Sequence, residues 1–100
     1  MTDASAMKAF FRPEGIALIG ATGDESKLGF GVARNLLGGK YPGSVHLVGS
    51  KEGTLFSRPL YTSVSDVPDP VDLAVILIPA PAVPSVLEAC GRRGIRSVVI

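Results

Sequence analysis

The sequence predicts an α/β protein with an open, parallel sheet and helices on both faces. Residues 15–20, 45–48 and 72–78 are apolar or small along most of their length, which is typical of strands covered on both sides. Apolar residues at helical spacing lie between these stretches. Strands that alternate with helices form βαβ units, in which successive strands are parallel.

The first half of the chain contains two predicted helices and two predicted strands. Apolar residues recur at helical spacing over 3–11, and Pro13 ends this short helix. The strand over 15–20 follows, and a polar loop over 21–29 separates it from the next helix; the second strand covers 45–48. Four apolar residues form one face of the second helix and two glycines end it: Val32, Ala33, Leu36, Leu37, Gly38 and Gly39.

The second half begins with the weakest pattern in the chain. Residues 54–70 predict only one helical turn, over 63–67, whereas 72–78 give the strongest strand signal and 95–100 begin another buried strand. Between these two strands, apolar residues spaced i, i+3, i+4 and i+7 predict a helix that ends near Gly91 or Gly94: Val83, Val86, Leu87 and Cys90.

The composition excludes several classes of protein. Hydrophobic residues make up 46% of the 100 positions and the net charge is +1, which excludes intrinsic disorder. Without runs of Lys or Arg, the chain has no electrostatic footprint for nucleic acid or for an anionic membrane. One Cys and one His form neither an internal disulfide nor a protein-only zinc site.

The ends of the chain predict a piece of a larger, cytoplasmic protein. Met1–Ser5 lack the features of a secretory signal, and the longest apolar stretch, 73–83, is well short of the ~20 residues that span a bilayer. The last residues, Val98–Ile100, lie inside an apolar strand, which is a poor place for a protein to end. We therefore expect one domain over 1–100, forming the N-terminal fragment of a longer protein.

The loop from Gly20 to Gly29 is the first candidate for ligand binding. It follows a strand and opens a helix, so its small residues allow backbone N–H groups to approach a phosphate, and Lys27 adds a full positive charge. Five residues separate Gly23 from Gly29, so neither the dinucleotide fingerprint nor the Walker A loop is matched. The alternative is that these glycines only form a tight turn between strand and helix.

Two further strand ends add candidate contacts at the same edge of the sheet. Ser50 and Lys51 follow the second strand, where an NAD site needs an acidic residue; a lysine suits a phosphorylated ribose and hence NADP or coenzyme A. Pro79–Pro81 form a rigid, apolar ledge suitable for an adenine face or a pantetheine arm. Each has a structural alternative: a solvated charge for Lys51 and a stiff turn for the prolines.

Together, the segments 11–22, 27–29, 48–51 and 71–80 resemble the CoA-binding domain of NDP-forming (ADP-forming) acyl-CoA synthetases. This family is related to the succinyl-CoA synthetase alpha subunit. The resemblance implies a Rossmann-like fold, truncated here in or just after the fifth strand, with coenzyme A lying across the strand ends. Gly49 and Ser50 depart from the pattern, since members usually carry Asn-Pro at these two positions. The expected CoA contacts are Gly20, Ala21, Thr22, Gly23, Lys27, Ser50, Lys51, Pro79 and Ala80.

The resemblance also implies a reaction, in which an acid, CoA and ATP give acyl-CoA, ADP and phosphate through a phosphohistidine in a later domain. No catalytic residue is expected in this chain, because His46 lies mid-strand and Cys90 lies on the apolar face of its helix. The remaining ligase domains, on the same chain or a partner subunit, are the expected partners. Two alternatives stay open: a stand-alone or regulatory CoA-binding module, for example one fused to an N-acetyltransferase, and an NADP-binding oxidoreductase domain.

Overall fold

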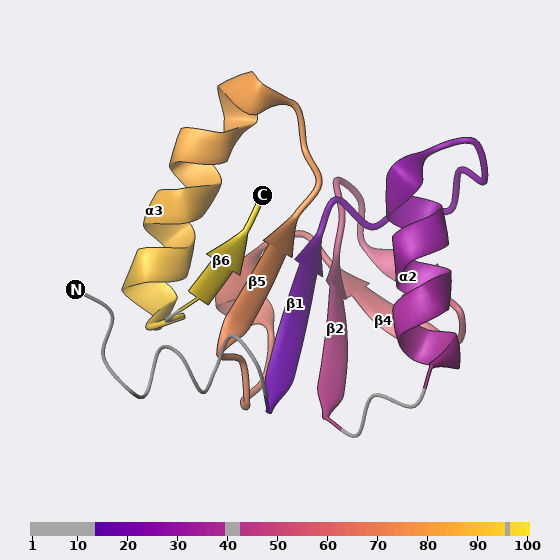
Figure 1. Ribbon diagram of the computed structural model, residues 1–100, viewed down its shortest axis with the longest axis horizontal. Coiled ribbons are helices and arrows are strands. Elements are labelled where there is room, and N and C mark those ends of the chain that lie inside the picture. The colour runs from indigo at the N-terminus through magenta and orange to yellow at the C-terminus, as the bar shows by residue number, and fades with distance from the viewer. Residues whose placement is uncertain (1–13, 40–42, 96) are drawn as a thin grey trace.

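The computed structural model describes residues 14–39, 43–95 and 97–100, so the helix predicted over 3–11 lies outside the described residues. In this part of the chain, six strands form one sheet in the order β3-β4-β2-β1-β5-β6 (Figure 1). All neighbouring strands are parallel except β3 and β4, which form an antiparallel hairpin. The strands are β1 (Gly15–Ile19), β2 (Ser44–Val48), β3 (Gly53–Leu55), β4 (Arg58–Tyr61), β5 (Leu73–Ile76) and β6 (Ser97–Val99).

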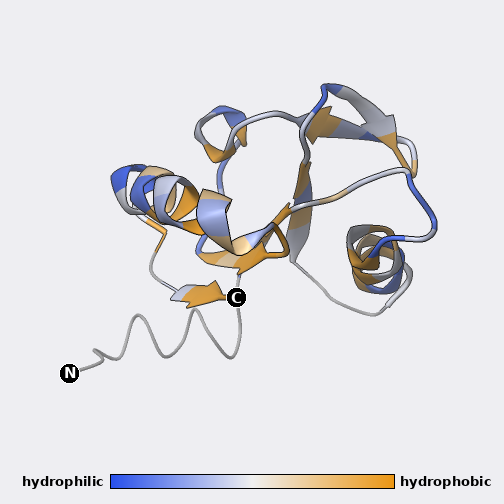
Figure 2. Ribbon diagram, turned by 90° about the horizontal axis from the view of Figure 1, so that it is seen from above, coloured by the Kyte–Doolittle hydropathy of each residue, from blue (hydrophilic) through white to orange (hydrophobic). Residues whose placement is uncertain are grey.

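Helices cover both faces of the sheet, as the apolar strands predict (Figure 2). Helix α2 (Leu28–Gly38) packs on one face; helix α3 (Val83–Arg93) and the short 3-10 helix η1 (Val64–Asp66) pack on the other. Every residue of β1 is buried, because Leu18 points to the α2 side while its neighbours Ala17 and Ile19 point to the α3 side. The α/β class, the parallel core and the helices on both faces are therefore confirmed.

The β3–β4 hairpin was not predicted from the sequence. Its two-residue turn consists of Phe56 and Ser57, both with positive φ, whereas the usual signal for such a turn is Asn-Gly or a similar pair. Pro59 further weakens the pattern of a strand in β4. The final strand, which the family resemblance implies to be the fifth, is the sixth strand of this sheet. The helical turn expected over 63–67 is confirmed as η1.

Two helix ends have the residues that the sequence predicts there. Helix α2 ends at Gly38, and α3 is followed by Gly94 in the left-handed conformation, whose N–H bonds to carbonyl groups of the last turn. None of the helices in the described ranges has the length and apolar character needed to cross a membrane.

Candidate functional site

A cavity of about 840 Å³ lies at the carboxyl ends of the parallel strands. Its lining comes from the segments that follow β1, β2, β4 and β5, and from α3. Because β2, β1 and β5 are neighbours in the sheet, the three strand ends singled out in the sequence meet at this one edge (Figure 1). This is the edge at which open α/β sheets bind ligands.

The start of the loop after β1 is held by backbone hydrogen bonds. The N–H groups of Gly20 and Ala21 both donate to the Val48 carbonyl, at 2.9 and 3.0 Å, and Leu77 N–H donates to the Ile19 carbonyl at 2.7 Å. The first two amides of the loop therefore serve the sheet, and the amides available to a ligand lie further along.

The middle of this loop is ordered around Asp24. Its N–H donates to Thr22 Oγ1 at 3.1 Å, and its Oδ1 accepts from the N–H and the hydroxyl of Ser26 at 3.0 and 2.6 Å. The two hydrogen bonds that the carboxyl accepts from Ser26, together with the charge of nearby Lys27, hold the pKa of Asp24 below its usual value. The loop thus keeps its shape through its own side chains.

The beginning of α2 is open to an anion. Lys27 is the N-cap residue and makes no side-chain capping bond, and the first turn contains no acidic residue. The first N–H groups of a helix have no partner within it, and together with the helix dipole they favour negative charge. Leu28 and Gly29, which begin α2, both line the cavity.

The glycines of the loop differ in whether packing requires them. A Cβ on Gly20 would lie 2.2 Å from the Leu77 carbonyl oxygen, and one on Gly29 would lie 1.9 Å from the Gly20 carbonyl oxygen. Both positions therefore need glycine for contacts within the protein. A Cβ on Gly23 would meet no atom within 4 Å, so packing within the described residues does not explain glycine there.

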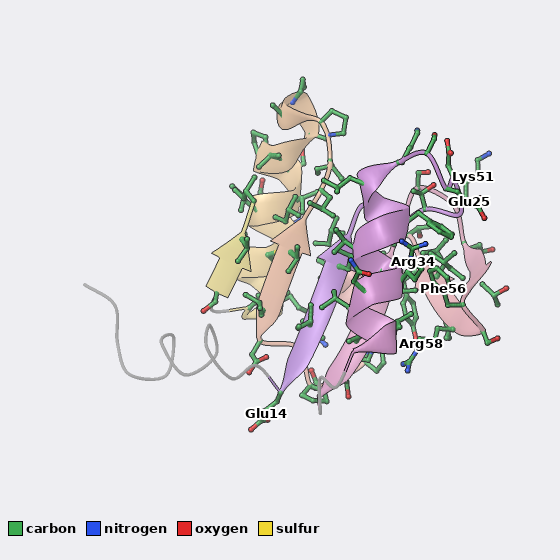
Figure 3. The ribbon with its side chains drawn as sticks, turned by 45° about the vertical axis from the view of Figure 1, so that its right-hand side comes forward. Glu14, Glu25, Arg34, Lys51, Phe56 and Arg58 are labelled. Carbon is green, nitrogen blue, oxygen red and sulfur yellow. The ribbon has the colours of Figure 1, made fainter. Side chains whose placement is uncertain are left out.

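Six of the nine predicted contact residues line the cavity: Gly20, Ala21, Thr22, Lys27, Ser50 and Pro79. The other three, Gly23, Lys51 and Ala80, are exposed and lie next to lining residues in the sequence. Lys51 lies between β2 and β3, on the side of the molecule where α2 begins (Figure 3). Contact of these nine residues with a ligand stays a prediction.

The cavity also has lining residues that sequence reasoning missed. Thr62 and Ser63 lie at the carboxyl end of β4, and they were missed because β4 itself was not recognised as a strand. Ser85, Val86 and Ala89 come from α3. The helix was predicted correctly, but Val86 was assigned only to the core, although it is half-buried and also faces the cavity.

His46 and Cys90 lie apart from this cavity. His46 is in β2, beside a smaller cavity of about 380 Å³ that also contacts Arg58 at the start of β4. Burial lowers the pKa of His46, with smaller effects from Arg58 and Arg93; a hydrogen bond with the Pro70 carbonyl acts in the opposite direction. Cys90 is 1% exposed, and burial raises its pKa, as befits an unreactive core thiol.

The parallel sheet between helices, with a ligand-sized cavity at its carboxyl edge, defines a Rossmann-like binding domain. The chain belongs to the family described as "CoA binding domain", which matches residues 14–100. The family resemblance noted from the sequence is confirmed, and so is coenzyme A as the ligand that the family implies.

Similar proteins include ADP-forming ligases. The alpha subunit of acetate–CoA ligase (ADP-forming) I from Pyrococcus furiosus is 39% identical over 98 residues, which cover 94% of this chain and 21% of that protein. A solved structure of dinucleotide forming acetyl-coenzyme A synthetase 1 from Ca. Korarchaeum cryptofilum, in complex with phosphate and ADP, is 38% identical with a TM-score of 0.91. The match covers all of this chain and 21% of that one. The chain thus spans about a fifth of the length of these two proteins.

A smaller protein has the same fold. The structure of a hypothetical protein from Pyrococcus horikoshii OT3 is 26% identical with a TM-score of 0.80. The match covers 98% of this chain and 68% of that one. The fold therefore occurs both as a part of long ligase chains and as most of a short protein.

Proposed function

We propose that this chain binds coenzyme A in the cavity at the carboxyl ends of β1, β2 and β5, as the CoA-binding domain of an ADP-forming acyl-CoA synthetase. The observation that supports this most directly is the cavity itself, because a family of CoA-binding domains matches the chain and the predicted strand ends converge there. In the reaction of an ADP-forming acyl-CoA synthetase, an acid, CoA and ATP give acyl-CoA, ADP and phosphate. The domain contributes by holding CoA.

Each part of the cavity suits a different part of CoA. The start of α2 and Lys27 offer N–H groups and positive charge to the pyrophosphate. Lys51, exposed beside the lining residue Ser50, would interact with the 3′-phosphate. Pro79 and the apolar part of α3 around Val86 offer surface to adenine or pantetheine.

Titration calorimetry on the 100-residue chain with CoA, 3′-dephospho-CoA, NADPH and NADH tests this proposal. We expect CoA to bind most tightly. Lys27 and Lys51 together match a ligand with both a pyrophosphate and a ribose phosphate, which favours CoA and NADPH over dephospho-CoA and NADH, and the family match favours CoA over NADPH. Tighter binding of NADPH than of CoA would favour an NADP-binding oxidoreductase domain and contradict the proposal.

The role of Lys51 is tested by Lys51→Ala. The matched control is Arg58→Ala, which also removes one exposed positive charge but lies at the start of β4, next to the hairpin turn. We expect Lys51→Ala to weaken CoA binding by about five- to tenfold, in line with the loss of one solvent-exposed hydrogen bond, and to change dephospho-CoA binding little. Arg58→Ala should leave both affinities near those of the original chain. Equal losses for both ligands in Lys51→Ala would remove its assigned role.

The catalytic steps and the partners belong to the same proposal. Residues 1–100 would form the N-terminal CoA-binding domain, and other domains, on the same chain or on a partner subunit, would carry the phosphohistidine and the nucleotide site. We place the enzyme in the cytoplasm, because its reaction draws on cytoplasmic CoA and ATP, and we assign it no nucleic-acid partner. A ligase assay of the full-length gene product, with acetate, CoA and ATP, tests this part.

A second function, a CoA-binding module without ligase chemistry, is favoured by the short Pyrococcus horikoshii protein, of which the matched region forms 68%. This alternative predicts the same calorimetry but no ligase activity. The coding sequence beyond residue 100 separates the two functions, since a phosphohistidine domain there would indicate a ligase and an acetyltransferase domain would indicate a regulator.

A further inference from the structure

The turn of the β3–β4 hairpin contains two residues whose side chains disfavour its backbone conformation. Phe56 and Ser57 have φ angles of 52° and 61°, in the left-handed region that side chains other than those of Gly, Asn and Asp disfavour. A two-residue hairpin turn with positive φ at both positions favours Asn-Gly. The phenylalanine therefore does not serve the turn, and its ring needs another explanation.

The ring of Phe56 contacts α2. Its centroid lies 5.1 Å from that of Phe30, with 44° between the ring planes, and the Arg34 guanidinium lies 5.9 Å from the Phe30 centroid. Both separations are in the range of favourable aromatic and cation–π contacts. Figure 3 shows Arg34, on α2, and Phe56, from the hairpin, on the same side of the molecule. We call the two rings the aromatic pair.

The aromatic pair joins two segments that flank the cavity. Phe30 directly follows Leu28 and Gly29, which line the cavity at the start of α2. Phe56 is at the far end of β3, and the residues before that strand include Ser50 and Lys51. Besides the pair, the hairpin is held by the pairing of β4 with β2, in the register Leu47↔Leu60 and Val48↔Tyr61, and by Leu55 and Leu60, which pack on the core at the α2 side. The Gly49 N–H also donates to the Tyr61 carbonyl at 2.7 Å, which fixes the first residue of the segment 49–52 but does not reach α2.

We propose that the aromatic pair fixes the segment 49–52 relative to the start of α2, so that Phe56 is a positioning residue for the ribose-phosphate end of the ligand. This inference rests on the proposed CoA function. Phe56 is 38% exposed, and its turn has a strained backbone conformation. A turn with a structural role alone would carry residues that avoid this strain.

The decisive variant is Phe56→Asn/Ser57→Gly, which removes the ring but installs the residues that this turn prefers. We expect the hairpin to remain formed while CoA affinity falls about three- to tenfold, which is within the range of interaction energies measured between residues in contact. The preference for CoA over dephospho-CoA should shrink, because Lys51 is no longer held. Phe56→Tyr, which keeps the ring, should bind as the original chain does. An unchanged CoA affinity and preference in the Asn-Gly variant would overturn the proposal.

Amide hydrogen exchange supplies a readout that does not depend on CoA. In the Asn-Gly variant we expect faster exchange at Gly49, whose N–H donates to the Tyr61 carbonyl, and at Phe30, whose N–H donates to the Lys27 carbonyl, with the β3–β4 ladder still protected. Unchanged exchange at both amides would overturn the proposal even if CoA bound. If the original chain does not bind CoA, the proposed function fails, and the exchange data alone then decide whether the aromatic pair links the two segments.

A double-mutant cycle with Phe30→Leu and Phe56→Leu tests whether the two rings act together. We expect each single change to weaken CoA binding and the double change to be no worse than either one, since each removes the same contact. Additive losses would contradict a shared role.

Discussion

Single residues in the loop after β1 have separable structural and ligand-binding roles. Gly29→Ala would place a methyl group 1.9 Å from the Gly20 carbonyl oxygen, and Gly20 is itself fixed by its bond to Val48. We expect this change to lower the free energy of unfolding by about 1–3 kcal/mol, as other overpacked sites do. Gly23→Ala meets open space and should change it by less than about 0.5 kcal/mol.

Urea unfolding of both variants measures these stabilities, and calorimetry with CoA completes the comparison. Gly23→Ala should weaken CoA binding while remaining as stable as the original chain, because the added methyl group would obstruct the close approach of a phosphate to the loop amides without meeting any atom of the protein. Equal stability losses in the two variants would contradict the packing argument for Gly29. Unchanged CoA binding in Gly23→Ala would remove Gly23 from the predicted contacts.

The pH dependence of stability between pH 7.5 and 5.5 is expected to depend on His46. Burial, Arg58 and Arg93 lower the pKa of its imidazole below its usual value of 6.5, so the unfolded chain takes up the proton at a higher pH than the folded chain does. The free energy of unfolding should therefore decrease as the pH falls through 6.5. The Asp24 carboxyl, whose pKa is lowered from 3.8, titrates below this range.

Chemical unfolding at several pH values measures this slope in the original chain and in His46→Asn. The asparagine amide keeps a donor for the Pro70 carbonyl but does not titrate, so its slope should be flatter. A slope of the same size in both proteins would assign the effect to another group.

At the scale of elements, the sequence predicts best where one element is covered on both sides. β1 and β5 have continuous apolar patterns because helices pack on both faces of the sheet. The hairpin escaped prediction because β3 is a short, exposed edge strand and its turn carries Phe56 and Ser57 in place of the residues that such a turn prefers. Local sequence preferences cannot reveal a turn whose residues contradict them.

The end of α3 offers a prediction about how an element is attached. Arg93 Nη2 donates to the Val67 carbonyl at 2.7 Å and to Asp69 Oδ1 at 2.8 Å, with the Arg93 side chain 20% exposed and that of Asp69 83% exposed. Arg93→Met keeps the apolar stem but leaves the carbonyl without its donor, so we expect a loss of about 1–3 kcal/mol. Asp69→Asn should cost less than about 1 kcal/mol, since the carboxylate is exposed.

Thermal or urea unfolding checks these values, with Arg92→Met as the control. Arg92 pairs with Glu88 at 2.7 Å on the exposed face of the same helix, and such pairs contribute about 0.3–0.5 kcal/mol. Similar losses for Arg92→Met and Arg93→Met would mean that the bond to the Val67 carbonyl adds nothing to the attachment of α3.

At the scale of the molecule, the position of the site was more predictable than its full lining. Parallel strands bring their carboxyl ends to one edge whatever the loops contain, so three strand ends sufficed to locate the cavity. Thr62 and Ser63 depended on a strand that was not recognised, and Ser85 depended on how α3 is placed over the sheet. These residues come to the cavity through packing between elements, which neither periodicity nor spacing encodes.

Cys90 reports on the stability of the whole molecule and on its ligand. The thiol is 1% exposed within the cluster that joins α3, η1 and the sheet, so it should react with iodoacetamide only through unfolding. A ligand that binds only the folded chain, present at 100 times its Kd, lowers the unfolded population about a hundredfold. Saturating CoA should therefore slow the labelling of Cys90 by about that factor when unfolding and refolding are fast.

Arg92→Cys in a Cys90→Ala background is the exposed control, and its labelling should not change with CoA. Labelling of Cys90 that is equally fast with and without CoA would show either local opening of α3 or the absence of CoA binding, and calorimetry on the same sample separates the two.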